Sequence, residues 1–250
     1  MKEDQLIFLD TETTGTGPTD RLCQVAYAYA GAEVEGLYRP PVPITIDAMA
    51  VTHITNKMVA ECEVFAGSPM FRDLEQILGS GAILVAHNAT FDVDMLRREG
   101  LMVPQSIDTF KLSHFLDTDG VIPRHNLQYL RYYHDLEVGE VVAHDALGDV
   151  RVLRALYAYQ YVEMLKRYGS DEATVFAEML AISARPILMK KFNFGKYTGQ
   201  TVKEVADKDA DYLAWLFNQK VMTREQGGED DENWIYTLDY YLNPDKQNKS

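Results

Sequence analysis

The pattern of apolar and polar positions predicts a chain that begins with strands and continues with alternating strands and helices. Apolar or alternating runs predict strands at 5–13, 22–30, 33–38, 82–87 and 105–108. Helical spacing predicts helices near 56–61, 70–78, 89–99, 110–116, 126–134, 146–168 and 171–183. The first three strands follow one another closely, as in an antiparallel meander. This order favours an α/β fold in which a mixed β-sheet is flanked by helices.

Two acidic residues, Asp10 and Glu12, lie near the end of the first predicted strand. Side chains alternate along a strand, so both are expected on one face and Thr11 on the other. Neighbouring acids on a half-buried strand repel each other, and a bound divalent cation is the usual remedy. An exposed pair on an edge strand is the alternative interpretation.

Three further polar residues occur where other predicted elements begin. Asp92 falls in the first turns of the 89–99 helix, Asp149 in the first turn of the 146–168 helix, and His144 just before that helix. Taken alone, each acid could simply be stabilised by the dipole of the helix that it begins, without any role in a site. His144 taken alone could be a solvated loop residue. Oxygen ligands with one unliganded histidine suit Mg²⁺ or Mn²⁺ better than zinc.

Taken together, the three motifs resemble those of the DEDDh family of 3′→5′ exonucleases, in the ribonuclease-H-like superfamily. The resemblance covers residues 5–168. It rests on D-x-E at Asp10 and Glu12, N-x-x-F-D ending at Asp92, and H-x-x-x-x-D from His144 to Asp149. The segment 43–55 also resembles the segment that precedes the first pair of helices in this family. A single motif of this kind occurs by chance in many chains, but three in family order and in matching contexts are specific.

The resemblance implies a ribonuclease-H-like mixed sheet and hydrolysis of nucleic acid with two Mg²⁺ ions, which Mn²⁺ can replace. By this resemblance Asp10 bridges the two ions, Glu12 and Asp149 complete the site that holds the attacking water, and Asp92 supports the site at the leaving 3′-oxygen. His144 is the implied general base, since an imidazole titrates near neutrality. The implied product is a nucleoside 5′-monophosphate. Thr13, His53 and Asn88 are the candidates for contacts with the substrate end.

The C-terminal part of the chain forms a predicted second module. The helix within 169–184 connects it, and Arg185-Pro186 marks its start, so the expected divisions are 1–168, 169–184 and 185–250. Its first part reads as strand, turn, strand and helix, a small α+β module that resembles the C-terminal module of the exodeoxyribonuclease X branch.

The segment 185–203 of this module carries five basic residues and no acid. Lys190, Lys191 and Lys196 are candidates for additional DNA contacts, with aromatic rings for base stacking. A packing or dimerisation element, and hence a homodimer, is the alternative.

Composition narrows the class of protein. The 250 residues carry a net charge of −14, which is implausible for a protein that coats duplex DNA but compatible with one that holds a few terminal nucleotides around metal ions. Two cysteines indicate neither a disulfide framework nor a zinc site. No apolar run is long enough for a signal peptide or a membrane span, so a cytoplasmic protein is expected.

These observations predict a 3′→5′ DNA exonuclease acting on single-stranded or duplex 3′ ends, in DNA repair or end processing. An RNA-trimming exonuclease, a polymerase proofreading subunit and an inactive nucleic-acid-binding scaffold remain alternatives. The C-terminal resemblance favours DNA, and the intact motifs favour an enzyme.

Overall fold

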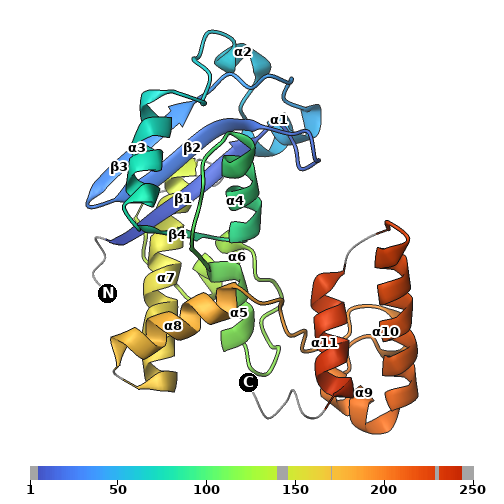
Figure 1. Ribbon diagram of the computed structural model, residues 1–250. Coiled ribbons are helices and arrows are strands. Elements are labelled where there is room, and N and C mark those ends of the chain that lie inside the picture. The colour runs from blue at the N-terminus through green and yellow to red at the C-terminus, as the bar shows by residue number, and fades with distance from the viewer. Residues whose placement is uncertain (1–4, 140–145, 170, 229–230, 244–250) are drawn as a thin grey trace. The chain divides into compact units, whose positions relative to one another are not determined.

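The computed structural model of the chain describes residues 5–139, 146–169, 171–228 and 231–243. Its contacts divide into two compact units. The first comprises Met1–Leu112 and Arg124–Ser183, and the second comprises Ser113–Pro123 and Ala184–Ser250. Figure 1 labels the elements of both units.

A five-stranded mixed sheet organises the first unit, with the strand order β3-β2-β1-β4-β5. Strands β1, β2 and β3 pair antiparallel, whereas β4 runs parallel to β1 and β5 parallel to β4. The expected meander and mixed sheet are therefore confirmed. The strand bounds are β1 Leu6–Thr13, β2 Leu22–Tyr29, β3 Ala32–Leu37, β4 Ile83–Ala86 and β5 Ser106–Asp108.

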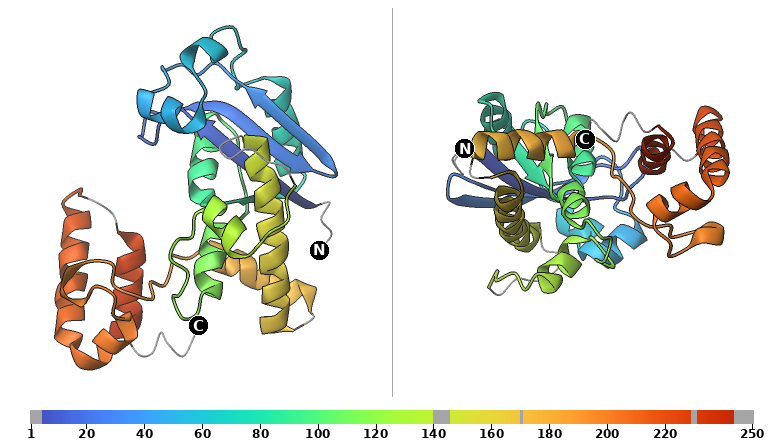
Figure 2. Two further views of the ribbon diagram at one scale, coloured as in Figure 1. Left: turned by 180° about the vertical axis from the view of Figure 1, so that it is seen from behind. Right: turned by 90° about the horizontal axis from the view of Figure 1, so that it is seen from below.

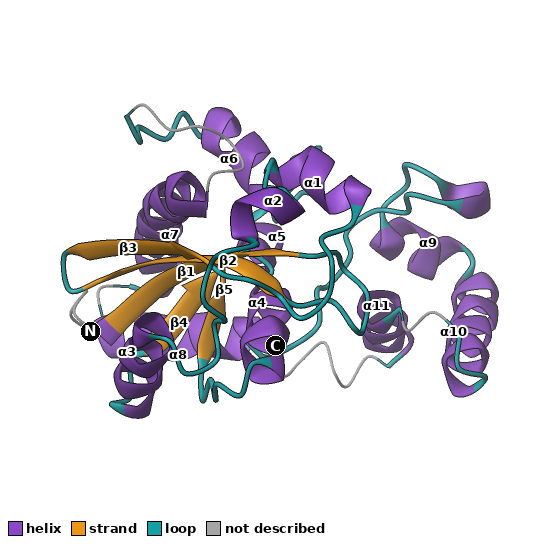
Figure 3. Cartoon of the chain, turned by 90° about the horizontal axis from the view of Figure 1, so that it is seen from above, coloured by secondary structure: helices purple, strands orange, loops and turns teal. Residues whose placement is uncertain are grey.

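Helices cover both faces of this sheet. Figure 3 shows α7 on one face and α3 and α4 on the other, and the view from behind in Figure 2 brings α7 to the front. The helix bounds in this unit and its connection to the next are α1 Ile46–Thr52, α2 Asn56–Val59, α3 Pro69–Gly79, α4 Ala89–Arg98, α5 Thr109–Leu116, α6 Leu127–Tyr133, α7 Ala146–Tyr168 and α8 Glu172–Ser183. The sequence pattern missed α1, which Thr45 caps by accepting from the Ala48 amide.

The alternation along β1 divides its side chains between two environments. Ile7 and Leu9 are fully buried in the main apolar cluster, which also contains Leu74 of α3 and Met95 of α4. On the other face, Phe8 packs edge-to-face against Tyr157 of α7, with ring centroids 5.4 Å apart. The central strand is thus anchored on both faces, which fixes where its acidic residues emerge.

The second unit is built from helices around its own apolar core. The core centres on Phe192, whose ring stacks on Trp234 with centroids 4.9 Å apart. Its helices are the short 3₁₀ helix η2 Gly195–Tyr197, α9 Val202–Lys208, α10 Ala210–Glu225 and α11 Glu232–Leu242. The remaining buried core residues are Tyr197, Val202, Val205, Leu213, Leu216 and Leu238.

Two details of this unit correct the sequence prediction. The expected strand–turn–strand segment contains only one isolated bridge among the described residues, between Lys191 and Thr201. The helix η2 lies between these two residues, at Gly195–Tyr197. The single expected helix is divided at Asp209, which has a non-helical φ of −150° and accepts a hydrogen bond from the Tyr212 amide as the cap of α10.

None of the described helices combines the length and apolar composition that a membrane crossing requires.

Candidate active site

The first carboxylates of the site project from the end of β1. Asp10 and Glu12 are both half-buried and lie on the face of the strand that α7 covers. Together with Asp149 they form a set in which one carboxylate oxygen from each residue lies within 4.8 Å of the others. Three carboxylates at this spacing could share one divalent cation.

Asp149 reaches the set from the first turn of α7, where it is buried. One of its carboxylate oxygens, Oδ1, accepts a hydrogen bond from the side-chain amide of Gln128 in α6, at 2.5 Å. The sequence placed Asp149 in this first turn, but nothing in its spacing indicated Gln128, which lies 21 residues earlier.

Asp92 approaches from the opposite side of the sheet. It is buried in the first turn of α4, and its Oδ1 accepts a hydrogen bond of 2.7 Å from the Thr11 hydroxyl. Thr11 therefore points away from Asp10 and Glu12, as the alternation of β1 predicted. The contact makes Thr11 a supporting residue, a role that the sequence pattern did not indicate.

The start of α4 is shaped by an unusual backbone position. Asn88, which precedes the helix, adopts the left-handed conformation with φ 67°. Its backbone N–H donates to Oδ1 of the buried Asp108 at 3.0 Å. The same Asp108 oxygen also accepts from the Phe110 amide at 3.0 Å. Asp108 thus ties the start of α4 to the start of α5 and helps to fix where Asp92 lies.

Crowding of negative charge dominates the electrostatics. Burial raises the pKa of Asp10 well above its ordinary value, and the charges of Asp92, Glu12 and Asp149 raise it further. Burial likewise raises the pKa of Asp92 to about 7, although the hydrogen bond from Thr11 opposes this shift. A cation bound among these groups would reverse both shifts by favouring the ionised forms. The donor set therefore fits a divalent metal ion.

The comparison with known families decides what kind of protein carries this site. A family model described as "Exonuclease" matches residues 7–157, which include β1 apart from Leu6, and the first half of α7. The chain belongs to the exonuclease family. A second model, described as "Exodeoxyribonuclease X-like C-terminal", matches residues 192–221. The family resemblance that the motifs indicated is confirmed for both parts of this exonuclease.

Relatives of the exonuclease agree with the models. Exodeoxyribonuclease 10 of Escherichia coli strain K12 is 34% identical over 183 residues, spanning 73% of this chain and 75% of that protein. A DNA polymerase III subunit epsilon-like protein of Rhodobacter capsulatus is 35% identical over 193 residues, which are 71% of this chain but 26% of that protein.

Solved structures show the same fold. A structure of exonuclease X in complex with 5′ overhanging duplex DNA superimposes with a TM-score of 0.53 and 27% identity, over 72% of this chain and 99% of that one. The ribonuclease-H-like sheet flanked by helices is thereby confirmed for the exonuclease.

The predicted general base, His144, lies outside the described residues of the exonuclease. Asp149, the other residue of the same motif, is described, as are Asp10, Glu12 and Asp92. The role of His144 remains a prediction from the resemblance.

Three candidates for substrate contact lie on the first unit of the exonuclease. The Thr13 hydroxyl donates to the Gly15 carbonyl at 2.7 Å, so its proton is already used within the loop after β1. His53 is exposed at the end of α1 in a left-handed conformation, and Asn88 is exposed at the start of α4. Contacts of these residues with a substrate remain predictions.

The lysine candidates lie in the second unit of the exonuclease, and the contacts of Lys191 and Lys196 are within the chain. Lys191 donates to the Gly120 carbonyl at 2.8 Å. Lys196 forms an ion pair of 2.9 Å with Asp209, and its ammonium lies 4.7 Å from the ring centroids of both Tyr197 and Tyr212. These contacts give both lysines a structural role, and DNA binding through Lys190, Lys191 or Lys196 remains a prediction.

Proposed function

We propose that this exonuclease removes nucleotides from the 3′ end of DNA and releases nucleoside 5′-monophosphates. The observation that carries the proposal is the convergence of Asp10, Glu12 and Asp149 within 4.8 Å, beside the buried Asp92. DNA is supported as the substrate by the relative named exodeoxyribonuclease 10 and by the neighbouring structure in complex with duplex DNA. A role in DNA repair or end processing, and a cytoplasmic location in a bacterial or phage-like setting, are further parts of the proposal.

The metal is proposed to be Mg²⁺, with Mn²⁺ as a substitute, because all the converging donors are carboxylates. Asp10, Glu12, Asp149 and Asp92 would hold two ions. Such ions, when bound, stabilise the negative charge that develops on the entering and leaving oxygens of the phosphodiester.

The side chains of the chain supply positioning and proton transfer. His144 is proposed to accept the proton of the attacking water on an imidazole nitrogen. Asp92 is held rigidly by Thr11 on the far side of β1, so it can support the end of the site where the 3′-oxygen leaves. The preference for the 3′ end of the DNA strand is proposed to come from contacts of Thr13, His53 and Asn88 with the terminal nucleotide.

A panel of oligonucleotides tests this function. Full-length protein with Mg²⁺ is given a 5′-labelled DNA strand, the matching RNA strand, and the DNA strand with a blocked 3′ end. We expect stepwise shortening of the DNA, release of 5′-mononucleotides, and no reaction at the blocked end. Internal cuts, or shortening from the 5′ end, would contradict the proposal, and preference for the RNA strand would replace DNA by RNA as the substrate.

A polymerase proofreading subunit is the second candidate. It is favoured by a 31% identity to the DNA polymerase III subunit epsilon of Treponema pallidum, over 64% of this chain and 78% of that protein. The match of residues 192–221 to the exodeoxyribonuclease X-like C-terminal model favours an independent exonuclease instead. Stable co-purification with a polymerase from the native host would support the proofreading role.

The second unit is proposed to add contacts with the DNA beyond the terminal nucleotides. Its basic segment 185–203 supports this role, although the intramolecular partners of Lys191 and Lys196 weaken it. Assembly of a homodimer through this unit is the alternative.

A further inference from the structure

Gln128 is a half-buried contact of the proposed metal centre that belongs to none of its motifs. It is the second residue of α6, a helix that Asn126 caps and that Leu127 and Leu130 anchor in the core. From this fixed position its Nε2 donates to Oδ1 of Asp149 at 2.5 Å. The hydrogen bond therefore joins a rigid helix to one member of the carboxylate set.

The oxygen of the same side-chain amide bears on how the Gln128 amide is oriented. Its Oε1 is buried and has no hydrogen-bond partner among the described residues. A buried acceptor without a partner destabilises a fold, so this arrangement needs a compensating reason. Turning the amide over would place its oxygen against the Asp149 carboxylate, where two acceptors repel each other. The carboxylate thus dictates the orientation of the amide.

We propose that Gln128 is a positioning residue for the metal ligand Asp149, an inference that rests on the proposed metal-dependent function. By engaging Oδ1, the amide fixes the rotation of the carboxylate and so the direction of its other oxygen. Residues that hold a ligand in this way raise metal affinity because the ligand loses less freedom when the ion binds. Gln128 never touches the substrate in this role.

The chain offers a matched control in Gln160. Gln160 is a buried glutamine whose Nε2 donates a hydrogen bond to the Thr109 carbonyl at 2.8 Å. Like that of Gln128, its Oε1 is buried and has no partner among the described residues. The acceptor for the Nε2 of Gln160 is thus a backbone carbonyl and not one of the carboxylates of the site. Substitution of either glutamine removes the same chemical group, but only Gln128 contacts the proposed ligand set.

The test measures Mn²⁺ binding by calorimetry on full-length wild type, Gln128→Met and Gln160→Met. Methionine keeps the length of the side chain and removes the amide. We expect the Mn²⁺ dissociation constant to rise about 10–100-fold in Gln128→Met and to stay within about twofold of wild type in Gln160→Met. At saturating Mn²⁺, kcat of Gln128→Met should recover toward wild type while its KM for DNA stays unchanged. If Gln128→Met unfolds, judged by circular dichroism, Gln128→Ala takes its place.

Wild-type Mn²⁺ affinity in the folded Gln128 variant would overturn the inference, as would an equal fall in affinity in both variants. The two proposals can fail separately. A wild-type protein that binds Mn²⁺ without cutting any oligonucleotide contradicts the exonuclease function, yet the comparison of variants still decides the role of Gln128. A wild-type protein that binds no Mn²⁺ would overturn both.

Discussion

The acidic residues of the site are positioned in three different ways. Asp10 and Glu12 are placed by strand alternation, Asp149 by an amide from α6, and Asp92 by the hydroxyl of Thr11. The motifs predicted the acids because their residue types and contexts are local features of the sequence. Gln128 and Thr11 could not be predicted in the same way, because their contacts depend on which distant elements pack together.

The role of His144 can be separated from metal binding. Because it is expected to accept a proton and not to hold an ion, His144→Ala should lower turnover about 10²–10⁴-fold while Mn²⁺ affinity stays close to wild type. Single-turnover kinetics and calorimetry on the same protein check this. A large drop in Mn²⁺ binding would make His144 a ligand and exclude it as the base.

The Thr11 hydroxyl is expected to stabilise the metal-free fold. Thr11→Val keeps the shape of the side chain but leaves a buried oxygen of Asp92 without its donor, which should cost about 1–3 kcal/mol in the free energy of unfolding. Urea denaturation in EDTA measures the change. Thr11→Ser retains the hydroxyl and should be less destabilised, so equal stability of the valine variant and wild type would contradict the hydrogen bond.

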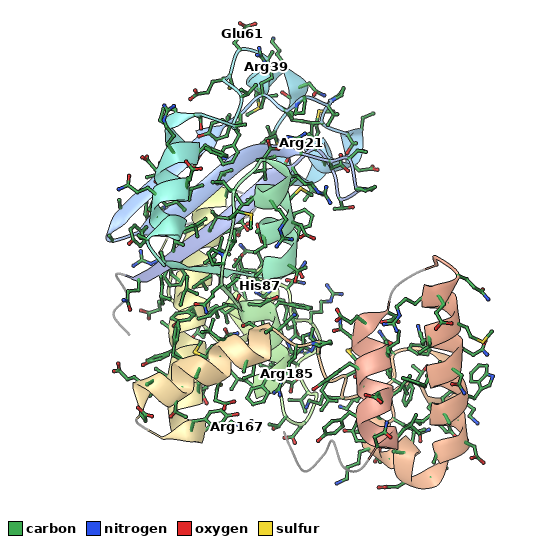
Figure 4. All side chains as sticks on the ribbon, viewed as in Figure 1. Arg21, Arg39, Glu61, His87, Arg167 and Arg185 are labelled. Atoms are coloured by element: carbon green, nitrogen blue, oxygen red, sulfur yellow. The ribbon has the colours of Figure 1, made fainter. Side chains whose placement is uncertain are left out.

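At the scale of elements, the junction between β4 and α4 depends on His87. Figure 4 shows His87 and Arg21 at opposite ends of α4, where Arg21 forms a two-bond ion pair with Glu99. Both ring nitrogens of His87 have partners, the Thr109 hydroxyl at 2.9 Å and the His125 carbonyl at 2.8 Å. Burial lowers the pKa of His87 to about 4, so the ring is neutral at pH 7.

A specific pH dependence of stability follows from this histidine. At a pH between the ordinary pKa of 6.5 and the folded-state pKa of about 4, His87 is protonated in the unfolded chain but neutral in the folded chain. The free energy of unfolding therefore has its full value above pH 6.5. It decreases as the pH drops from 6.5 toward 4, by up to about 3 kcal/mol. His87→Gln should remove this part of the slope, as measured by urea denaturation at several pH values. Identical slopes in the two proteins would contradict it.

The elements also show where sequence patterns succeed. The meander and the later strands and helices were predictable because each has its own periodicity and one buried face. The strands expected in the C-terminal part are reduced to the single bridge between Lys191 and Thr201, because the short helix η2 occupies Gly195–Tyr197 and α9 begins at Val202. The break at Asp209 was missed because apolar spacing continues through it into α10, while the change in backbone direction depends on a single cap.

For the whole molecule, the contribution of the second unit to DNA binding can be tested by removing it. If it binds DNA phosphates, removal of residues 184–250 should weaken binding to long DNA and flatten the salt dependence, by about 0.7–0.9 in the log–log slope for each phosphate that is no longer bound. Affinity measured over a salt series checks this, with circular dichroism as the control for folding, because Ser113–Pro123 loses its packing partners in the truncated chain. An unchanged slope with a shift from dimer to monomer in sedimentation would instead assign the unit to assembly.

The carboxylate set at the end of β1 is tested most directly by the dependence of DNA hydrolysis on Mg²⁺ in wild type and in Asp10→Asn. The substitution keeps the size of the side chain and removes the charge that the other three acids surround. We expect wild-type hydrolysis in Mg²⁺, none in EDTA, and a reduction of at least ~10³-fold in folded Asp10→Asn at saturating Mg²⁺. Undiminished hydrolysis in EDTA, or wild-type turnover in Asp10→Asn, would contradict metal-dependent catalysis at this site.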